Sequence, residues 1–248
     1  MAFDVEQELE IAIRTIGGFR VTALIDNASK FENADFVFPK AEVTVELKCL
    51  DEDKIGDEKI IEKASRLYQE EFLAGKSPIL VYGTTRLTTH GFSRQYWESI
   101  GSLYRVPIER RVRKADRQIE ETKKAMKRHN DTGLLIIANN NHSALTPWHA
   151  KYILEEIAKQ EKYDFINSII YISANMQVEM PGHEQIFDCW LEIKRIHLPP
   201  IGQQFLDLLR SRWYEHLALI RGVQPPAQVK INAEILAKFD NKGCSDHN

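Results

Sequence analysis

The sequence predicts an α/β fold, a mixed sheet flanked by helices, with an insertion after the third strand and a C-terminal extension. The expected elements follow the order helix, three strands, helix, strand, helix, strand, which is typical of a mixed sheet covered by helices. Hydrophobic residues make up 43% of the chain and charged residues 28%, an ordinary globular balance. With 248 residues, the chain can bury a core without disulfide or metal staples.

The N-terminal part predicts one helix followed by three strands. Apolar residues recur at helical spacing over residues 3–16, and Gly17-Gly18 ends that helix. A loop rich in Asn, Asp and Ser separates the first strand from the second, and a short turn at Pro39-Lys40 joins the second to the third. The predicted strands are 19–25, 34–38 and 42–50.

Residues 51–105 are less regular and are interpreted as an insertion. Within it we expect a helix over 57–75, a short strand over 78–83 and a turn-rich aromatic run over 84–99. The elements after the insertion are a charged helix over 107–129, a buried strand over 132–140, a helix from Pro147 to Gln160 with Thr146 as N-cap, strands over 166–174 and 186–196, and a closing helix over 202–222.

The domain organisation expected from this order is simple. Residues 1–200 form one α/β domain that contains the insertion, and residues 201–248 form a C-terminal helix and tail that pack on the same domain.

Composition excludes several classes of protein. The three cysteines are scattered and form no CxxC pair, which argues against a disulfide framework and a cysteine zinc site. The chain has no HExxH and no GxSxG motif. No apolar run approaches 18 residues, so we expect no membrane span. The N-terminus is acidic and unlike a signal peptide, so a cytoplasmic location is expected.

The hairpin predicted over 34–50 gathers charge on one face. Side chains alternate along a strand, so Thr44, Glu46 and Lys48 point the same way. The short turn would pair Asp35 with Thr44 and place Asp35 diagonal to Glu46, roughly 7–8 Å away on the same face. A register one residue different would put Asp35 on the other face, so the geometry is permitted and not forced.

Two carboxylates on adjacent strands suit Mg²⁺ or Mn²⁺, which prefer oxygen ligands. Such an ion lowers the pKa of a bound water and stabilises charge on a phosphate. Lys48 would lie beside that water, where it could orient the nucleophile. The alternative is a solvated strand face whose charges serve only solubility.

At these residues the sequence resembles the PD-(D/E)XK nuclease superfamily. The match consists of Asp35, ten intervening residues, and Glu46-Leu47-Lys48. The order of predicted elements around the motif is similar as well, and the resemblance covers roughly residues 3–140. Ala34 stands where the family motif often has proline.

The resemblance implies a restriction-endonuclease-like fold with Asp35 and Glu46 as ligands of Mg²⁺ or Mn²⁺ and Lys48 as the water-positioning residue. The implied function is metal-dependent hydrolysis of phosphodiester bonds, with DNA as the expected substrate. The alternative is a non-catalytic nucleic-acid-binding or assembly subunit with the same fold. A homo-oligomer or a partner subunit is left open.

The resemblance also implies two supporting residues. Many members of the superfamily bring an acidic residue of the first helix near the metal, and Glu8 lies nearest the buried stripe of that helix. The helix after the motif strand often supplies a Gln or Lys, for which Gln118 is the candidate. Each of the two could instead be an ordinary polar residue at the flank of a helix.

Two segments carry cations suited to a nucleic-acid backbone. Residues 105–129 hold ten Lys or Arg and four Asp or Glu, whereas the whole chain has a net charge of −3. A solvated helix with i,i+4 ion pairs is the alternative. The run over 84–99 interleaves basic and aromatic residues, which suits stacking and phosphate contact, or an interaction with another protein. The predicted nucleic-acid-binding residues are Arg110, Arg113, Arg117, Arg86 and Arg94.

Overall fold

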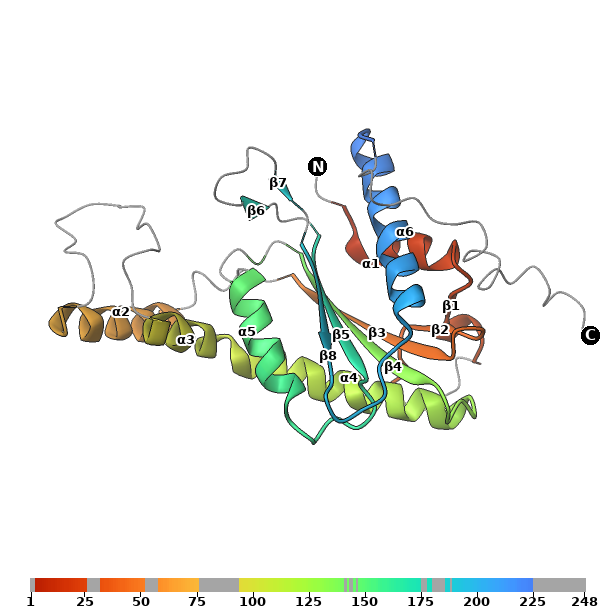
Figure 1. Ribbon diagram of the computed structural model, residues 1–248, viewed down its shortest axis with the longest axis horizontal. Helices are drawn as coiled ribbons and strands as arrows, with labels where there is room; N and C mark the ends of the chain where they lie inside the picture. Colours follow the sequence, from red (N-terminus) through yellow and green to blue (C-terminus); the bar gives the residue numbers. More distant parts are fainter. Residues whose placement is uncertain are drawn as a thin grey trace, which may run out of the picture.

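The computed structural model describes residues 3–25, 32–51, 58–75, 94–140, 142, 145, 147–174, 178–179, 186–187 and 189–224. Its centre is a six-stranded mixed sheet in the order β1-β2-β3-β4-β5-β8, with helices on both faces (Figure 1). The predicted α/β architecture is thereby confirmed. None of the described helices combines the length and the apolar character needed to cross a membrane.

The strands in the sheet are β1 (Phe19–Arg20), β2 (Phe36–Phe38), β3 (Val43–Leu50), β4 (Thr132–Asn139), β5 (Ser168–Ser173) and β8 (Trp190–Lys194). A separate ribbon pairs β6 (Val178–Glu179) with β7 (Ile186–Phe187). The helices are α1 (Val5–Arg14), the short 3-10 helix η1 (Val21–Ala23), α2 (Glu58–Leu73), α3 (Arg94–Leu103), α4 (Arg105–Ala125), α5 (Pro147–Ala158) and α6 (Gln203–Arg221).

The pairing of neighbouring strands changes twice across the sheet, from antiparallel to parallel and back to antiparallel. Strands β1, β2 and β3 are antiparallel, β3, β4 and β5 are parallel, and β8 returns antiparallel to β5. The parallel strands are buried on both faces, as expected for strands joined by helical crossovers. Strand β3 therefore lies inside the molecule, and its charged residues do not lie on an open face.

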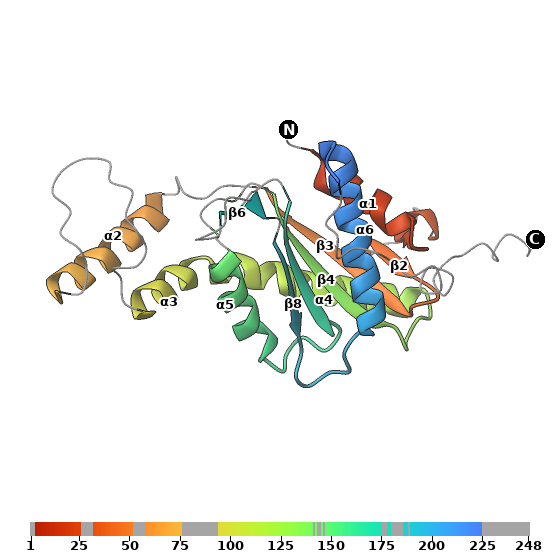
Figure 2. The same ribbon diagram turned by 45° about the horizontal axis from the view of Figure 1, so that its top comes forward.

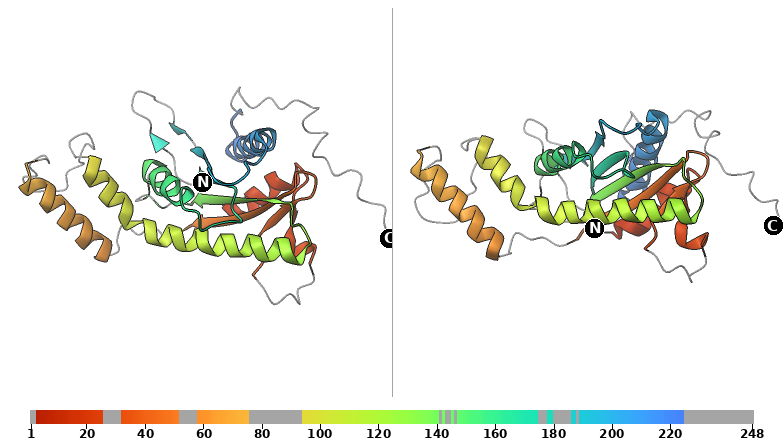
Figure 3. Two further views of the ribbon diagram at one scale, coloured as in Figure 1. Left: turned by 60° about the horizontal axis from the view of Figure 1, so that its bottom comes forward. Right: turned by 90° about the horizontal axis from the view of Figure 1, so that it is seen from below.

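Two helical layers enclose the sheet (Figure 3). Helices α1 and α6 cover one face, where Leu9 and Trp213 join a core cluster with Val45 of β3. Helices α4 and α5 cover the other face, where Ile119 and Leu154 pack in a second cluster. The C-terminal helix predicted over 202–222 thus belongs to the main core.

The first predicted strand, 19–25, is shorter in the structure. Only Phe19–Arg20 pairs with β2, and the chain then turns into η1. The Val21 carbonyl accepts from the N–H groups of Leu24 and Ile25. The apolar residues here are spaced i, i+3 and i+4, which matches a helical turn as well as a strand, and η1 buries Val21 completely.

Helices α2 and α3 lie beyond the end of the sheet (Figure 2). The helix predicted over 57–75 is confirmed, whereas α3 occupies part of the run predicted to be turns over 84–99. From Arg94 to Ile100 no Gly or Pro interrupts the chain, so a helix can form there. Helix α4 begins two residues before the predicted start at Pro107, since proline is tolerated in the first turn. The strand predicted over 78–83 and the tail over 225–248 lie outside the described residues.

Gly133 allows the close approach of the β5 entry loop to β4. A Cβ built at Gly133 would lie 1.8 Å from the Phe165 carbonyl oxygen, and the Gly133 N–H donates to Asn167 Oδ1 at 2.7 Å. We expect Gly133→Ala to lower the free energy of unfolding by about 1–3 kcal/mol, because the backbone has to shift. Urea unfolding measures this. Gly202→Ala, where a Cβ meets no atom within 4 Å, is the matched control, and equal losses in both variants would refute the steric explanation.

Candidate functional site

The hairpin register places Asp35 beside Glu46. Phe38 pairs with Val43 and Phe36 with Val45, so the next position along the ladder sets Asp35 opposite Glu46. The Asp35 N–H donates to the Val45 carbonyl at 3.1 Å. The Asp35 carboxylate Oδ2 accepts from the Leu47 N–H at 2.8 Å, which ties the side chain to β3.

This register differs from the expected one by two residues. The sequence predicted a short turn with Asp35 paired to Thr44, whereas residues 39–42 form the connection and Glu42 adopts φ 53°. A shift of two keeps every side chain on its face because the strand period is two. Asp35 therefore keeps the predicted face and moves from a diagonal position to one directly opposite Glu46.

Glu46 is a buried carboxylate under helix α4, not a solvated one. Its side chain is 1% exposed, and its Oε1 accepts a hydrogen bond from the Lys48 ammonium. Its second oxygen, Oε2, is buried and receives no hydrogen bond from any described residue. The alternative of a solvated strand face is thereby excluded for Glu46, and its Oε2 is left to a proton shared with Asp35 or to a ligand that displaces that proton.

The two carboxylates perturb each other's ionisation. Burial raises the pKa of Glu46 to about 8, and the neighbouring Asp35 adds to the rise while Lys48 opposes it. Burial also raises the pKa of Asp35, against the Leu47 N–H and the Lys48 ammonium. At neutral pH the pair therefore favours keeping one proton, as expected for two carboxyl groups that share a site.

Helix α4 holds both Lys48 and the segment before Asp35. Lys48 Nζ donates to Gln118 Oε1 at 2.7 Å, and Gln118 Nε2 donates to the Asn33 carbonyl at 2.9 Å. One turn further along α4, Thr122 Oγ1 accepts from the Ala34 N–H at 2.7 Å, with both groups buried. A role for Gln118 in catalysis stays a prediction, but its contact with Lys48 is now described.

Sequence reasoning missed Thr122, although the signal was present. Thr122 follows Ala115 and Ile119 at positions i+7 and i+3 on the buried face of α4. A polar residue on an apolar helix stripe needs a hydrogen-bond partner inside the protein. Only the fold could identify that partner as the main chain beside Asp35.

The acidic residues Glu6 and Glu8 of α1 contact different parts of the protein. Glu8 Oε2 lies 2.6 Å from His216 Nε2 of α6, so the structure places Glu8 against the C-terminal helix. Glu6 is the α1 residue whose charge raises the pKa of Asp35. It also accepts from Arg20 at 2.7 Å. A role for Glu8 near a metal stays a prediction, and the structure adds His216 of α6 as its neighbour.

The predicted nucleic-acid contacts are distributed around α4. Arg117 forms an ion pair with Glu32 at 3.2 Å, whereas Arg110 and Arg113 are exposed and line a pocket. Lys124 forms the expected i,i+4 pair with Glu120 at 2.5 Å, and nucleic-acid binding by Arg110, Arg113 and Arg117 stays a prediction. Arg86 lies outside the described residues, and Arg94 begins α3 with a side chain outside the description.

The chemistry of the hairpin suits a hard divalent cation. Within the described ranges, no group of three or more His, Cys, Asp or Glu side chains could hold a metal ion. The candidate is the Asp35–Glu46 pair, and Mg²⁺ is commonly bound through one or two carboxylates and otherwise by water and phosphate. The unsatisfied Glu46 oxygen fits such a ligand role. No protein-family model, curated protein or solved structure matches the chain.

The raised pKa of Glu46 predicts that stability depends on pH. Because the folded protein binds this proton more tightly than the ordinary value of 4.5 allows, the stabilisation is complete below that pH and is lost as pH rises through about 8. The slope cannot exceed about 1.4 kcal/mol per pH unit for one proton. Urea unfolding in EDTA at pH 5–8 measures it. We expect Glu46→Gln to flatten the profile and the exposed Glu62→Gln to leave it unchanged, and a profile unaltered by Glu46→Gln would contradict the assignment.

The Thr122 contact predicts a second effect. Thr122→Val keeps the shape but leaves the buried Ala34 N–H without its acceptor, which costs about 1–3 kcal/mol of stability. Thr122→Ser restores the hydroxyl and should recover most of it. Amide hydrogen exchange of Ala34, measured by NMR, should accelerate in Thr122→Val and remain slow in Thr122→Ser. Equal exchange in both variants would show that the hydroxyl does not hold the segment.

Proposed function

We propose that this protein is a metal-dependent nuclease of the restriction-endonuclease-like type, which hydrolyses phosphodiester bonds in DNA. The observation that carries the proposal is the buried carboxylate pair. Asp35 and Glu46 lie side by side, the Lys48 ammonium contacts Glu46, and one Glu46 oxygen receives no hydrogen bond within the described structure. A buried charge cluster with an unsatisfied carboxylate oxygen lowers the stability of a fold. Its presence therefore favours a role in binding or chemistry.

Mg²⁺ or Mn²⁺ bound by Asp35 and Glu46 would supply a water of lowered pKa and positive charge against the phosphate oxygens. Glu46 must lose its proton to act as a ligand, so its affinity for the ion rises with pH up to about 8. Asp35 is held towards β3 by the Leu47 N–H, which orients its carboxylate before any ligand binds. The two carboxylates therefore provide a prearranged pair of oxygen ligands.

Lys48 is the candidate for positioning the nucleophile. Its ammonium has three N–H donors, of which one contacts Glu46 and one contacts Gln118. The remaining donor is available to a water or a phosphate oxygen. Gln118 is itself anchored to the Asn33 carbonyl, so it fixes the Lys48 ammonium relative to the segment that carries Asp35.

The one departure from the superfamily motif has a physical reason. The Ala34 N–H donates to Thr122 Oγ1, and proline has no N–H to donate. Proline would restrain this position through its ring, whereas alanine is restrained by a hydrogen bond to α4. Both devices restrain the residue that precedes the aspartate, which supports the comparison with the motif.

An assembly subunit of the same fold is the second candidate function, and one observation favours it. Helix α2 lies away from the sheet and exposes Ile61 at 48%, Phe72 at 43% and Leu73 at 84%. Apolar side chains gathered on one helix are typical of a surface for another protein. This role would not require the carboxylate pair to bind a metal.

Cleavage assays distinguish the two candidates. Supercoiled, linear and single-stranded DNA are incubated with the protein and Mg²⁺, Mn²⁺ or EDTA. We expect metal-dependent cleavage, and a loss of at least about 100-fold in Asp35→Asn, Glu46→Gln and Lys48→Ala, since loss of residues that only support a ligand already costs 10–100-fold. Glu42→Gln, an exposed residue of the same hairpin, should retain activity.

Circular dichroism of each variant shows whether it remains folded. If the folded variants cleave DNA as well as the wild type does, the active site lies elsewhere in the protein. A folded wild-type protein that binds nucleic acid but cleaves none of the three substrates with either metal would favour the assembly subunit.

A further inference from the structure

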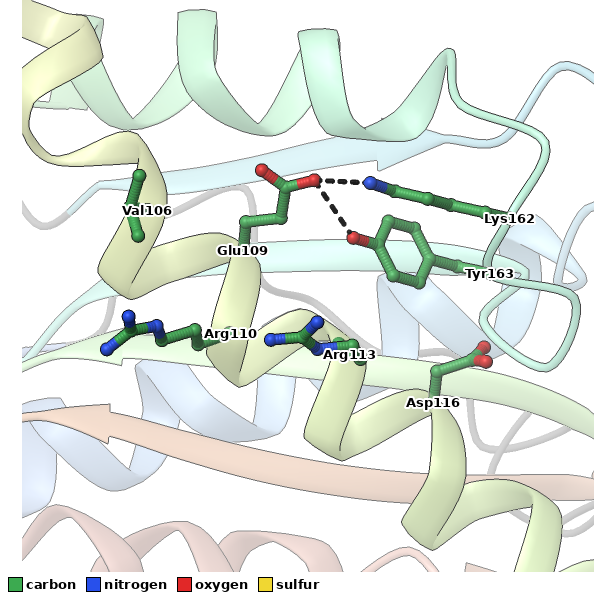
Figure 4. Close-up of a pocket in the computed structure, with 7 residues that line it drawn as sticks. All are labelled: Val106, Glu109, Arg110, Arg113, Asp116, Lys162 and Tyr163. Atoms are coloured by element: carbon green, nitrogen blue, oxygen red, sulfur yellow. Dashed lines mark hydrogen bonds and ion pairs between the residues drawn. The ribbon is translucent and has the colours of Figure 1, made fainter.

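A second polar site lies on the other flank of α4. A cavity of about 380 Å³ opens between α4 and the loop that leads from α5 to β5 (Figure 4). Around the axis of α4, Gln118 lies about 140–180° from Glu109, Arg113 and Asp116 and about 80° from Arg110. Most of the cavity therefore faces away from the carboxylate pair, with Arg110 at its edge. Its polar lining residues are Glu109, Arg110, Arg113, Asp116, Lys162 and Tyr163.

The acidic groups of the cavity already have donors. Glu109 Oε1 accepts from Lys162 Nζ at 2.6 Å and from the Tyr163 hydroxyl at 3.2 Å. The hydrogen bond from Lys162 is the main reason that the pKa of Glu109 is lowered. Asp116 Oδ1 accepts from the Phe165 N–H at 2.9 Å, and in Figure 4 its carboxylate points away from the arginine side chains.

The two arginines of the cavity are not used by the fold. Among the described residues, neither Arg110 nor Arg113 makes a hydrogen bond or an ion pair. They are three residues apart on α4, so their side chains leave the same face of the helix. Other cations nearby are compensated, since Lys162 pairs with Glu109 and Arg117 with Glu32. The cavity is therefore lined by two guanidinium groups that follow one another along α4 and have no ion pair within the described part of the chain.

We propose that this cavity binds a phosphate group. Each guanidinium presents planar paired donors that match phosphate oxygens, and two adjacent guanidiniums match the charge of a phosphate monoester better than that of a single carboxylate. The volume is at the lower end of the range of small-ligand pockets, sufficient for a phosphate with part of its substituent. The binding site stands on these residues alone, whereas assigning the phosphate to a nucleic-acid strand rests on the proposed nuclease function.

Inorganic phosphate is the first probe, titrated into the full-length protein and followed by the NMR signals of the arginine side chains. We expect saturable binding that weakens at least tenfold in Arg110→Gln/Arg113→Gln. The double Arg-to-Lys variant should bind with intermediate affinity, because it keeps the charge and loses the planar donors. Arg66→Gln on α2 is the matched control for loss of one arginine charge and should bind as wild type. Absence of saturable binding, or equal binding by the double Gln variant, would overturn the proposal.

The same titration of Glu46→Gln separates this site from the nuclease proposal. If that variant binds phosphate as the wild type does and has lost cleavage, the phosphate site and the nuclease proposal are both supported. If the wild-type protein binds phosphate and cleaves no substrate, only the phosphate site is supported.

Oligonucleotides then identify the source of the phosphate. Tighter binding of a terminally phosphorylated strand than of its hydroxyl-ended form, lost in the double Gln variant, assigns a strand end. Equal binding of the two forms, weakened in that variant, assigns an internal phosphodiester. If the double Gln variant binds oligonucleotides as tightly as the wild type, the nucleic-acid assignment is wrong, and the ligand is a small phosphorylated molecule.

Discussion

The Glu46 carboxyl group is buried between β3 and α4, and the residues around it are arranged to accommodate it. A carboxylate in the interior costs free energy unless it is paired, protonated or bound to a ligand. Here Lys48 pairs with one oxygen, and burial together with Asp35 favours a proton on the group. Each of these partners is itself held in place: the hairpin positions Asp35, and helix α4 positions Lys48.

Helix α4 binds the hairpin with one part of its surface and lines the cavity with another. On the side of the hairpin, Gln118 and Thr122 bind Lys48 and the main chain before Asp35. Arg113 on the opposite flank and Arg110 beside it line the cavity without partners among the described residues. A single rigid helix thus fixes the spacing between the carboxylate pair and the proposed phosphate site, which a loop could not do.

The C-terminal helix α6 determines which neighbour Glu8 of α1 contacts. Helix α6 packs beside α1, and its His216 contacts Glu8. Glu6 of α1 accepts a hydrogen bond from Arg20, and its charge adds to the rise in the pKa of Asp35 by less than burial does. The assignment of acidic residues on α1 therefore depends on a segment about 200 residues away in the chain.

The sequence alone predicts the α/β class, most of the helices and strands, and a common face for Glu46 and Lys48, which Asp35 shares in the predicted register. These follow from local periodicity, which is a property of neighbouring residues, and a two-residue error in register leaves the face unchanged. The folded structure buries this face under α4, brings the Thr122 hydroxyl to the chain beside Asp35, and places Glu8 against His216. Burial and such pairings depend on which distant segments pack together, and no local pattern carries that information.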